Sequence, residues 1–319
     1  MIEIKVPARV HGTLIGLSAD GYRINGGVGW AVDHPSLVVK VRPATECRIV
    51  DLRACPLGEE ENRNLVIFLS KTAADTKLTR GFRVELAGEL PAHKGLGGGT
   101  AVRLAILEAL FLLNDRPYTP EQLINLSRRG GTSGVGIRTY FQGGFHLDLG
   151  HKTNEPARPS NQWVKPHSPL SLFAAEMPAW QIGIFVPSWI PSVTHAMERR
   201  LFSEKLPITS IEVWETLYHA TYGLAASISE VDATTFCTAV DALQATAWKR
   251  AEWQLHGAPL EDATRILRLA GAEGIGLTSI GPSLYFYAES FDARLVPKAF
   301  REAIYLTTPS VGGRQVLRR

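Results

Sequence analysis

The sequence contains few cysteines, little net charge and no long apolar run. Its three cysteines, Cys47, Cys55 and Cys237, are scattered through 319 residues and match neither a zinc-ligand spacing nor a disulfide framework. We therefore expect a cytoplasmic protein in a reducing compartment. The net charge of +3 is small for this length, and it argues against a nucleic-acid partner, which would call for a clustered basic surface.

Segments that would enter or cross a membrane are also missing. The longest apolar stretch, near residues 105–113, is interrupted by Glu108 and is too short to span a bilayer. The first five residues, 1–5, lack the charged-then-apolar pattern of a secretory signal. We expect no membrane partner. Hydrophobic residues make up 45% of the chain and charged residues 20%, as in an ordinary globular protein.

Length and composition predict two domains. A chain of 319 residues exceeds the size at which one core usually stops growing. Residues 152–178 are rich in proline and polar residues, and we interpret them as the connection between domains at 1–160 and 180–319. Strand and helix patterns alternate irregularly on both sides, which favours an α+β fold.

Local patterns predict the elements around the candidate motifs. We expect strands at 2–10, 37–41 and 82–86, a glycine-dense turn at 25–29, a charged loop at 59–64, and helices at 100–113, 211–227 and 233–255. Trp248 and Trp253 lie on the last of these helices, where we expect them to pack in the core.

The segment 91–101, Pro-Ala-His-Lys-Gly-Leu-Gly-Gly-Gly-Thr-Ala, is the most informative stretch. Four of its five positions from 95 to 99 are glycines, so backbone N–H groups can converge on a ligand, and the following helix adds its positive N-terminal dipole. Glycine composition alone fits a flexible loop equally well, but the apolar helix favours a phosphate or pyrophosphate site. The predicted ligands are Lys94, Gly95, Gly97, Gly98, Gly99 and Thr100.

Three motifs together resemble the GHMP kinase superfamily. Pro-x-x-x-Gly-Leu-Gly at 91–97 resembles its second signature, 276–282 its third, and the glycines at 26–29 its first. The resemblance implies an ATP-binding-like motif and a two-domain α+β GHMP-kinase-like fold, with a ribosomal-protein-S5-like N-terminal domain and a ferredoxin-like C-terminal domain.

The kinase residues themselves are replaced. The segment that resembles the superfamily's catalytic Pro-Ser-Gly-aliphatic-Asp motif is 132–136, and it ends in Gly136 where the kinases have the aspartate. Gly99 stands where many of them have a metal-binding serine. Without a base and metal ligands, phosphoryl transfer loses its positioning and its charge neutralisation. We therefore expect no kinase activity.

The replacing segments resemble the β-ribofuranosylaminobenzene 5′-phosphate synthases of tetrahydromethanopterin biosynthesis. They are 9–14, 25–29, 129–136 and 143–151. The resemblance implies a pentosyl transferase, a decarboxylating C-glycoside synthase. It would join 5-phosphoribosyl 1-pyrophosphate (PRPP) to 4-aminobenzoate or a close analogue, releasing CO₂ and pyrophosphate. Gly12 and Leu149 depart from the family pattern and leave room for another acceptor, such as 4-hydroxybenzoate.

The resemblance and this chemistry together select the remaining site residues. Arginine forks suit a carboxylate and a phosphate, and His146 and Asp148 alternate on one predicted strand, so they face one side. That pair would hold Mg²⁺ through water, polarise the substrate amine, or form a buried structural pair; Mg²⁺ is the expected cofactor. The predicted catalytic residues are His11, Arg138, His146 and Asp148, with Asp148 also a metal candidate. The further predicted substrate-binding residues are Arg9, Asn25, Gly26, Gly27, Arg129, Gly131, Thr132, Ser133 and Gly134.

Two competing functions stay open at this point. One is an ATP-dependent GHMP small-molecule kinase with an unrecognised base, and the other is a non-catalytic sugar-phosphate-binding protein. We further expect a homodimer.

Overall fold

The computed structural model describes residues 1–78, 81–152, 157–159 and 168–318. Its strands are β1 (Ile2–Gly16), β2 (Asn25–Pro43), β3 (Arg48–Asp51), β4 (Phe82–Gly88), β5 (Phe145–Asp148), β6 (Ser171–Ala175), β7 (Ile182–Phe185), β8 (Glu273–Leu277), β9 (Leu284–Tyr287), β10 (Ile304–Thr307) and β11 (Gln315–Arg318). Its α-helices are α1 (Glu59–Asp75), α2 (Gly98–Leu113), α3 (Pro120–Ser127), α4 (Val135–Gln142), α5 (His195–Lys205), α6 (Ser210–Tyr218), α7 (Ala226–Glu230), α8 (Ala233–Gln244), α9 (Ala247–Gln254), α10 (Ala258–Leu269) and α11 (Lys298–Glu302). A π-helix, η2 (His219–Ala225), joins α6 to α7, and a short 3₁₀ turn, η3 (Ala293–Leu295), precedes α11.

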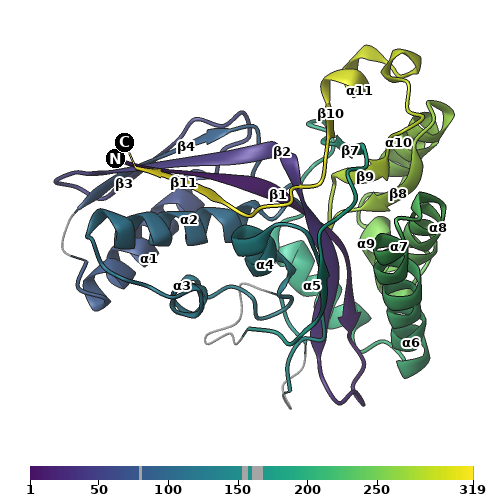
Figure 1. Cartoon of the computed structure of the whole chain (residues 1–319), viewed down its shortest axis with the longest axis horizontal. Coiled ribbons are helices and arrows are strands. Elements are labelled where there is room, and N and C mark those ends of the chain that lie inside the picture. The colour runs from purple at the N-terminus through teal and green to yellow at the C-terminus, as the bar shows by residue number, and fades with distance from the viewer. Residues whose placement is uncertain (79–80, 153–156, 160–167, 319) are drawn as a thin grey trace.

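The described strands form two sheets, as an α+β fold requires. The larger sheet has the order β11-β1-β2-β4-β3, with β5 and β6 added along β2. The smaller has the order β10-β7-β9-β8. Neighbouring strands are antiparallel except for β3 beside β4. Helices α1–α4 cover one face of the larger sheet, and α6–α10 lie beyond the smaller one (Figure 1).

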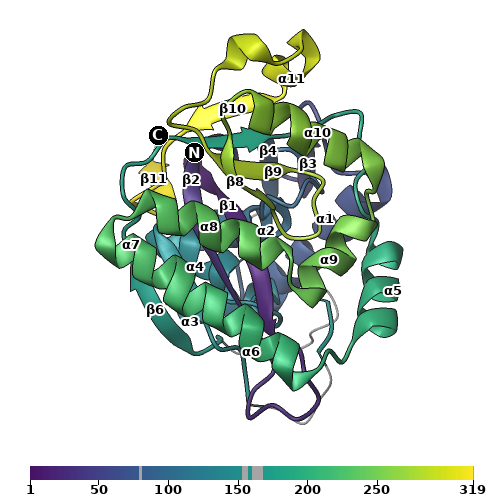
Figure 2. The ribbon, with the colours of Figure 1, turned by 90° about the vertical axis from the view of Figure 1, so that its right-hand side faces the viewer.

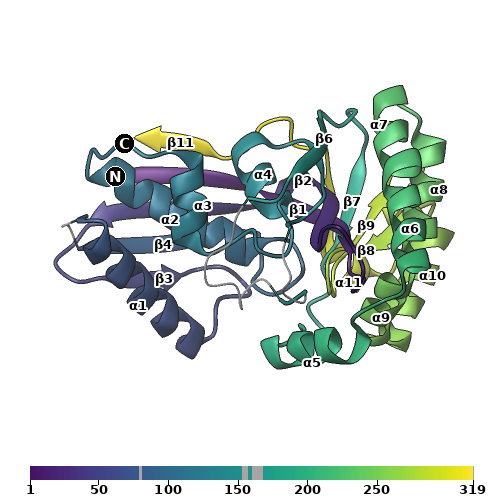
Figure 3. The ribbon, with the colours of Figure 1, turned by 90° about the horizontal axis from the view of Figure 1, so that it is seen from below.

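One of the hydrophobic clusters among the described residues contains side chains of both halves. Trp30 of β2 is fully buried and packs edge-on against Tyr285 of β9 and Phe236 of α8, with ring centroids 5.0 and 5.5 Å apart. The β1–β2 hairpin projects between the halves (Figure 3), and helices α6–α8 cross over it (Figure 2). This packing gives the motifs on both halves fixed relative positions.

Two strands depart from the predicted domain boundaries. The second sheet begins with β7 at Ile182, close to the predicted 180, but β11 returns to pair with β1, Ile2 opposite Arg318. The last strand thus belongs to the first sheet rather than to a unit at 180–319. β6 also lies in the first sheet, inside the predicted connection, because it completes the edge of β5. Residues 153–156 and 160–167 of that connection lie outside the described residues.

Two local predictions were wrong. Residues 25–29 form the start of β2 rather than a turn, because their small size lets β2 approach its neighbours: a Cβ on Gly29 would lie 2.2 Å from the carbonyl oxygen of Val10. Residues 59–64 begin helix α1 rather than a loop. Three glutamates in that first turn favour the helix N-terminus through its dipole.

The long predicted helices are also divided. The segment 211–227 contains the π-helix η2, and 233–255 breaks between α8 and α9 at residues 245–246. Within the described residues, no helix is both long and apolar enough to span a membrane.

Candidate active site

The glycine-rich loop ends as a bare helix N-terminus. Helix α2 begins at Gly98, and Gly97, with φ +79°, occupies the cap position without a side-chain cap. The N–H groups of Thr100 and Ala101 bond back to the carbonyl of Gly97. Within the described part of the chain, the N–H groups of Gly98 and Gly99 have no partner. Two unsatisfied donors and the dipole of a four-turn helix are features that favour anion binding at a helix N-terminus.

Individual glycines of the loop serve different purposes. Gly95 has φ +79°, and a Cβ there would lie 2.3 Å from the carbonyl oxygen of Thr278. A Cβ on Gly97 would lie 2.9 Å from the Cβ of Arg9. A Cβ on Gly98 would meet nothing closer than 3.4 Å. Packing therefore requires glycine at 95 and 97, whereas at 98 the protein itself leaves room.

Lys94 is held by the C-terminal half. Its ammonium donates to the carbonyls of Pro187 and Ile190, at 2.9 and 2.7 Å, and burial lowers its pKa. The side chain thus fastens the glycine loop to the segment that follows β7. This contact leaves one of its three N–H donors for an anion.

Two cavities are lined by neighbouring residues of the first turn of α2, one by Gly99 and the other by Thr100. The larger, about 910 Å³, lies between the loop, α1 and the segment before α5, and its polar lining includes Glu61, His93, Gly99, Arg129 and His195. The smaller, about 90 Å³, has room for roughly six waters or one small ring. Its lining includes Arg9, His11, Thr100, Ser133, Trp248 and Glu252. A ligand lying across the turn would reach both.

Two arginines flank the turn with free guanidinium nitrogens. Nε and Nη1 of Arg9 and Nε of Arg129 are buried and have no hydrogen-bond partner. Burial lowers the pKa of each guanidinium to about 10. Because an unpaired buried cation is costly, both positions favour an anionic ligand. Arg138, which we predicted to be catalytic, instead donates from Nη2 to the carbonyl of Pro169 at 2.7 Å, and its buried Nε has no partner.

A hydrogen-bonded chain joins Asp148, Ser133 and His11. The Ser133 hydroxyl donates to the Asp148 carboxylate at 3.2 Å, and Nε2 of His11 lies 3.2 Å from the same hydroxyl oxygen. Backbone N–H groups of Gly134 and Gly150 also bond to Asp148, at 2.9 and 3.1 Å. All three side chains come from different segments, β5, the turn before α4, and β1.

The local backbone explains this convergence. The β1–β2 register shifts between His11 and Thr13, so Gly12 is an extra residue of the kind that re-aims side chains beside active sites. A Cβ on Gly27 would lie 2.7 Å from both Nε2 of His11 and Oγ of Ser133. Only glycine at position 27 allows the two side chains to meet.

The pKa shifts of Asp148 and His11 determine the protonation states of these hydrogen-bonded side chains. Burial raises the pKa of Asp148 to about 6 despite its hydrogen bonds, so the carboxylate is ionised at neutral pH. Burial, with Arg9 and Lys249 nearby, lowers the pKa of His11 well below its ordinary value. His11 is therefore neutral. Because the Ser133 hydroxyl donates its hydrogen bond to Asp148, its oxygen can only accept from His11. His11 must therefore donate from Nε2, which leaves Nδ1 as an acceptor.

The pair predicted on β5 separates in the structure. His146 is buried, with Nε2 2.6 Å from the carbonyl of Gly143 and Nδ1 lacking a partner, whereas Asp148 bonds toward α4 and Gly150. No hydrogen bond joins the two. Both Asp148 oxygens already accept bonds, and the described residues contain no cluster of three His, Cys, Asp or Glu side chains suited to a metal ion.

Other predicted binding residues hold residues 131–133, the turn that carries Ser133, in place. Asn25 donates from its amide to the carbonyl of Gly131 at 3.1 Å, and the N–H of Gly26 donates to the carbonyl of Thr132 at 3.1 Å. The Thr132 hydroxyl donates to the carbonyl of Arg158. These contacts anchor the turn that carries Ser133, so their role here is positioning.

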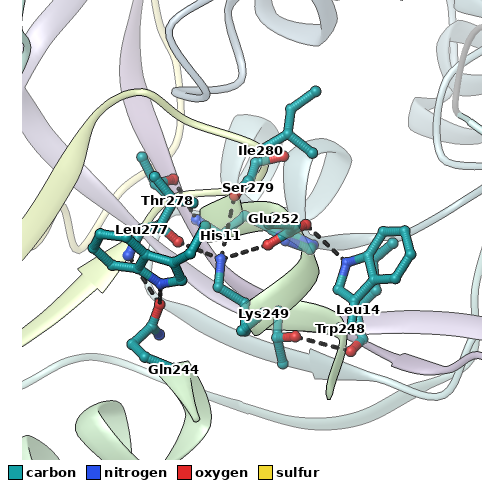
Figure 4. Close-up of polar contacts among 12 residues, drawn as sticks. His11, Leu14, Gln244, Trp248, Lys249, Glu252, Leu277, Thr278, Ser279 and Ile280 are labelled. Carbon is teal, nitrogen blue, oxygen red and sulfur yellow. Dashed lines mark hydrogen bonds and ion pairs between the residues drawn. The ribbon is translucent and has the colours of Figure 1, made fainter. Parts of the chain in front are cut away.

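Sequence reasoning missed a buried charged pair on α9. Lys249 and Glu252 are almost fully buried and form an ion pair of 2.6 Å directly beneath the third glycine motif (Figure 4). Trp248, predicted to be core, is buried but also lines the smaller cavity. The only signal in the sequence was an i, i+3 Lys–Glu spacing, which is far more common on exposed helix faces.

The chain resembles known proteins in sequence and in fold. Residues 64–140, which include the glycine loop, match the family described as GHMP kinases N terminal domain. The chain also resembles solved structures over nearly its whole length. Homoserine kinase from Cytophaga hutchinsonii aligns with TM-score 0.66 and 18% identity, covering 99% of this chain and 97% of that one. Mevalonate diphosphate decarboxylase from Staphylococcus aureus aligns with TM-score 0.64 and 12% identity, covering 100% and 99%. At these identities the likeness is one of fold.

Curated relatives are closer in sequence. The chain is 29% identical over 286 residues to β-ribofuranosylphenol 5′-phosphate synthase of Methanothermobacter thermautotrophicus, covering 88% of this chain and 87% of the relative. It is 26% identical to the enzyme of that name from Methanocaldococcus jannaschii, covering 90% and 89%. The chain is thus an enzyme with the two-domain α+β fold of the GHMP kinases and their N-terminal domain, and over most of its length it resembles the β-ribofuranosylphenol 5′-phosphate synthases.

Proposed function

We propose that this enzyme is a decarboxylating phosphoribosyl transferase. It would join PRPP to a para-substituted benzoate and release CO₂ and pyrophosphate, as a step toward tetrahydromethanopterin. The observation that carries the proposal is the first turn of α2, where the free N–H groups of Gly98 and Gly99 lie between two unpaired guanidinium groups, Arg9 and Arg129. The two N–H groups suit a leaving pyrophosphate, and the two guanidinium groups suit the other anionic groups of the substrates.

The donor would lie along that turn. Its pyrophosphate would take the N–H groups of Gly98 and Gly99, which stabilise the negative charge that develops as the bond to the sugar breaks. Arg129 faces the larger cavity and would hold the 5-phosphate through its planar fork. Nδ1 of neutral His11 is free to accept a hydrogen bond from a hydroxyl of the ribose.

The acceptor would occupy the smaller cavity. Leu14, Ile137, Phe202, Trp248 and Ile280 give it apolar walls suited to a flat ring. Arg9 supplies free N–H groups for a carboxylate. Our expectation from the sequence was 4-aminobenzoate, but the names of the curated relatives describe a ribofuranosylphenol. That name favours 4-hydroxybenzoate, and we propose it as the preferred acceptor.

The reaction needs no phosphoryl transfer and no base at the kinase position. Pyrophosphate leaves, the ring carbon that bears the carboxylate bonds to the sugar, and CO₂ departs to restore the aromatic ring. Gly136 lines the smaller cavity beside Thr100 and offers no base for the alternative, a GHMP kinase. A non-catalytic sugar-phosphate binder would have no use for an acceptor cavity.

Magnesium would arrive with the donor. Mg²⁺ is commonly held by substrate phosphates and water with few protein ligands, which fits the lack of a metal-binding cluster among the described residues. We propose that it enters as the complex with pyrophosphate oxygens rather than as a resident ion. The homodimer and the cytoplasmic location stay predictions.

The proposal is tested by incubating the protein with PRPP, Mg²⁺ and a carboxyl-labelled acceptor, either 4-hydroxybenzoate or 4-aminobenzoate. We expect labelled CO₂ and pyrophosphate in equal amounts. Binding of PRPP without release of either product would favour the non-catalytic alternative. ADP formation from ATP with a small alcohol would favour the kinase.

A further inference from the structure

Glu252 is a buried carboxylate that keeps unused acceptor capacity. Its side chain is 3% exposed, and it lies at the wall of the smaller cavity. One oxygen accepts from the indole N–H of Trp248 at 2.7 Å and the other from the ammonium of Lys249 at 2.6 Å. A carboxylate offers about four acceptor positions, so each oxygen can take one more donor. Within the described residues none supplies it.

Lys249 holds this carboxylate in place but cannot satisfy it further. Its ammonium also donates to the carbonyls of Leu277 and Ser279, at 2.6 and 3.2 Å, which uses all three of its N–H donors (Figure 4). The third glycine motif thus fixes Lys249, and Lys249 fixes Glu252. The result is a rigid acceptor aimed at a ligand site.

The residues that line the smaller cavity indicate which hydrogen-bond donor would pair with Glu252. Phe202 and Trp248 pack edge-on, with ring centroids 5.0 Å apart, and line the cavity with Leu14 and Ile280. Arg9 lines the same cavity, where burial lowers the pKa of its guanidinium and the Glu252 carboxylate partly offsets this, but its Nε and Nη1 have no hydrogen-bond partner. An aromatic acid with its carboxylate on Arg9 would thus present its para group to a separate acceptor.

We propose that Glu252 accepts the proton of the acceptor's para-hydroxyl and thereby selects a phenol over an aniline; this rests on the proposed function. The phenolic O–H bond breaks, and its proton passes to Glu252. The electrons drive the bond between the carboxylate-bearing carbon and the sugar as pyrophosphate leaves. The C–CO₂ bond then breaks, its electrons restore the ring, and Glu252 returns the proton to the oxygen. An aromatic amine does not give up a proton to a carboxylate, so this residue does not assist it.

The raised pKa of Glu252 suits a residue that takes up and returns the phenolic proton. Burial raises its pKa, although Lys249 and Trp248 favour the charged form. The other titratable groups that line the cavity are Arg9 and His11 from β1 and Glu198 from α5. A carboxylate with a raised pKa is a stronger base toward a phenol than an exposed one.

The test compares Glu252→Gln with the parent, using 4-hydroxybenzoate and 4-aminobenzoate as acceptors. Glutamine keeps the shape and can still accept from Lys249. The matched control is Glu204→Gln, an exposed carboxylate of α5 that pairs with Arg200 at 2.6 Å and lines neither of the two cavities. We expect Glu252→Gln to lower kcat with 4-hydroxybenzoate about a hundredfold, the usual effect of losing a general base, with little change in KM. Turnover of 4-aminobenzoate should change by less than about threefold, and Glu204→Gln should leave the preference between acceptors unaltered.

The parent enzyme provides a second measurement if Glu252→Gln does not fold. Its kcat with 4-hydroxybenzoate should fall at low pH, where Glu252 is protonated, more steeply than its kcat with 4-aminobenzoate. Equal losses with both acceptors in Glu252→Gln, or matching pH profiles in the parent, would mean that Glu252 only supports Lys249. Failure of the proposed function looks different, because the parent would then release no CO₂ from either acceptor.

Discussion

The hydroxyl of Thr278 donates to the carbonyl of Gly95 at 2.9 Å, joining two glycine motifs that lie 183 residues apart in the sequence. The same hydroxyl accepts from the backbone N–H of His11 at 3.0 Å. One threonine therefore links the phosphate loop, the third motif and the strand that carries the site histidine. The arrangement makes specific demands on Gly95, which has φ +79°.

Replacing Gly95 by alanine should destabilise the fold. The new Cβ would lie 2.3 Å from the carbonyl oxygen of Thr278, and the left-handed backbone adds about 1–2 kcal/mol. We expect a total loss of roughly 2–4 kcal/mol in the free energy of unfolding, measured by urea denaturation. Gly98→Ala is the matched control, since its Cβ meets nothing closer than 3.4 Å. Equal stability of the two variants would contradict the proposed close approach.

Substitution of Gly98 should affect ligand binding rather than the stability of the fold. Gly98→Val is expected to fold but to weaken PRPP binding, because the side chain blocks the approach of pyrophosphate to the first turn of α2. Lys94→Ala should weaken it by a smaller factor, since two of the three donors of Lys94 already bond to carbonyls. One lost charged hydrogen bond corresponds to roughly 1.5–3 kcal/mol, or about tenfold to a hundredfold in affinity. Calorimetric titration decides, and unchanged affinity in a folded Gly98→Val protein would remove this turn from the site.

Asp148 should make stability and activity respond oppositely to pH. Its pKa is raised from 3.8 to about 6 by burial, so the folded protein holds this proton more tightly than the unfolded chain does. Its contribution to stability is thus present below about pH 4 and is lost as the pH rises toward about 6, by roughly 3 kcal/mol. Activity should rise over the same window, because ionised Asp148 fixes Ser133 and His11.

The comparison variant for this effect is Asp148→Asn, which cannot titrate. Denaturation of both proteins at about pH 4 and pH 6.5 isolates the contribution of Asp148 from that of other groups. A constant difference in stability between the two proteins across this range would show that the pKa of Asp148 is not raised.

Restoring the kinase aspartate should harm the synthase. A Cβ on Gly136 would contact Thr100 at an ordinary 3.6 Å, so Gly136→Asp should fold. Its added negative charge would face the acceptor's carboxylate, and we expect KM for the acceptor to rise by about tenfold or more. Gly136→Asn adds the same bulk without the charge. If both variants raise KM equally, steric obstruction rather than charge is responsible.

The fold could be predicted because three motifs along the chain resemble those of the GHMP kinases, and the glycine-rich loop before a helix could be predicted because its residues are close in sequence. Glycine at the cap position, followed by an apolar helix, favours a helix N-terminus without a side-chain cap. The domain pairing of β11 with β1 could not be predicted, since nothing in residues 315–318 indicates a partner more than 300 residues away. The glycines at 25–29 were assigned to a turn because a close strand approach and a turn both require glycine.

The site was harder to predict where burial decides the role of a side chain. His11 and Ser133 meet only because Gly27 leaves space and Gly12 shifts the register. In the sequence, Lys249 and Glu252 have the spacing of a surface ion pair. In the structure the ammonium of Lys249 also donates to the carbonyls of Leu277 and Ser279, and this tertiary contact cannot be read from the spacing. Their alternating positions predicted that His146 and Asp148 would face one side of the strand. In the structure, Asp148 accepts from the backbone N–H of Gly134, whereas the His146 ring lies against the carbonyl of Gly143.

The central claim is that this enzyme forms a carbon–carbon bond between ribose and the ring carbon that loses its carboxylate. The most direct measurement is NMR of the product made from PRPP labelled with ¹³C at C1 of the ribose and 4-hydroxybenzoate labelled with ¹³C at the carboxylate-bearing ring carbon. We predict a one-bond coupling between the two labelled carbons in a product that retains the 5′-phosphate. A product with the sugar on the para oxygen, without that coupling, would contradict the account.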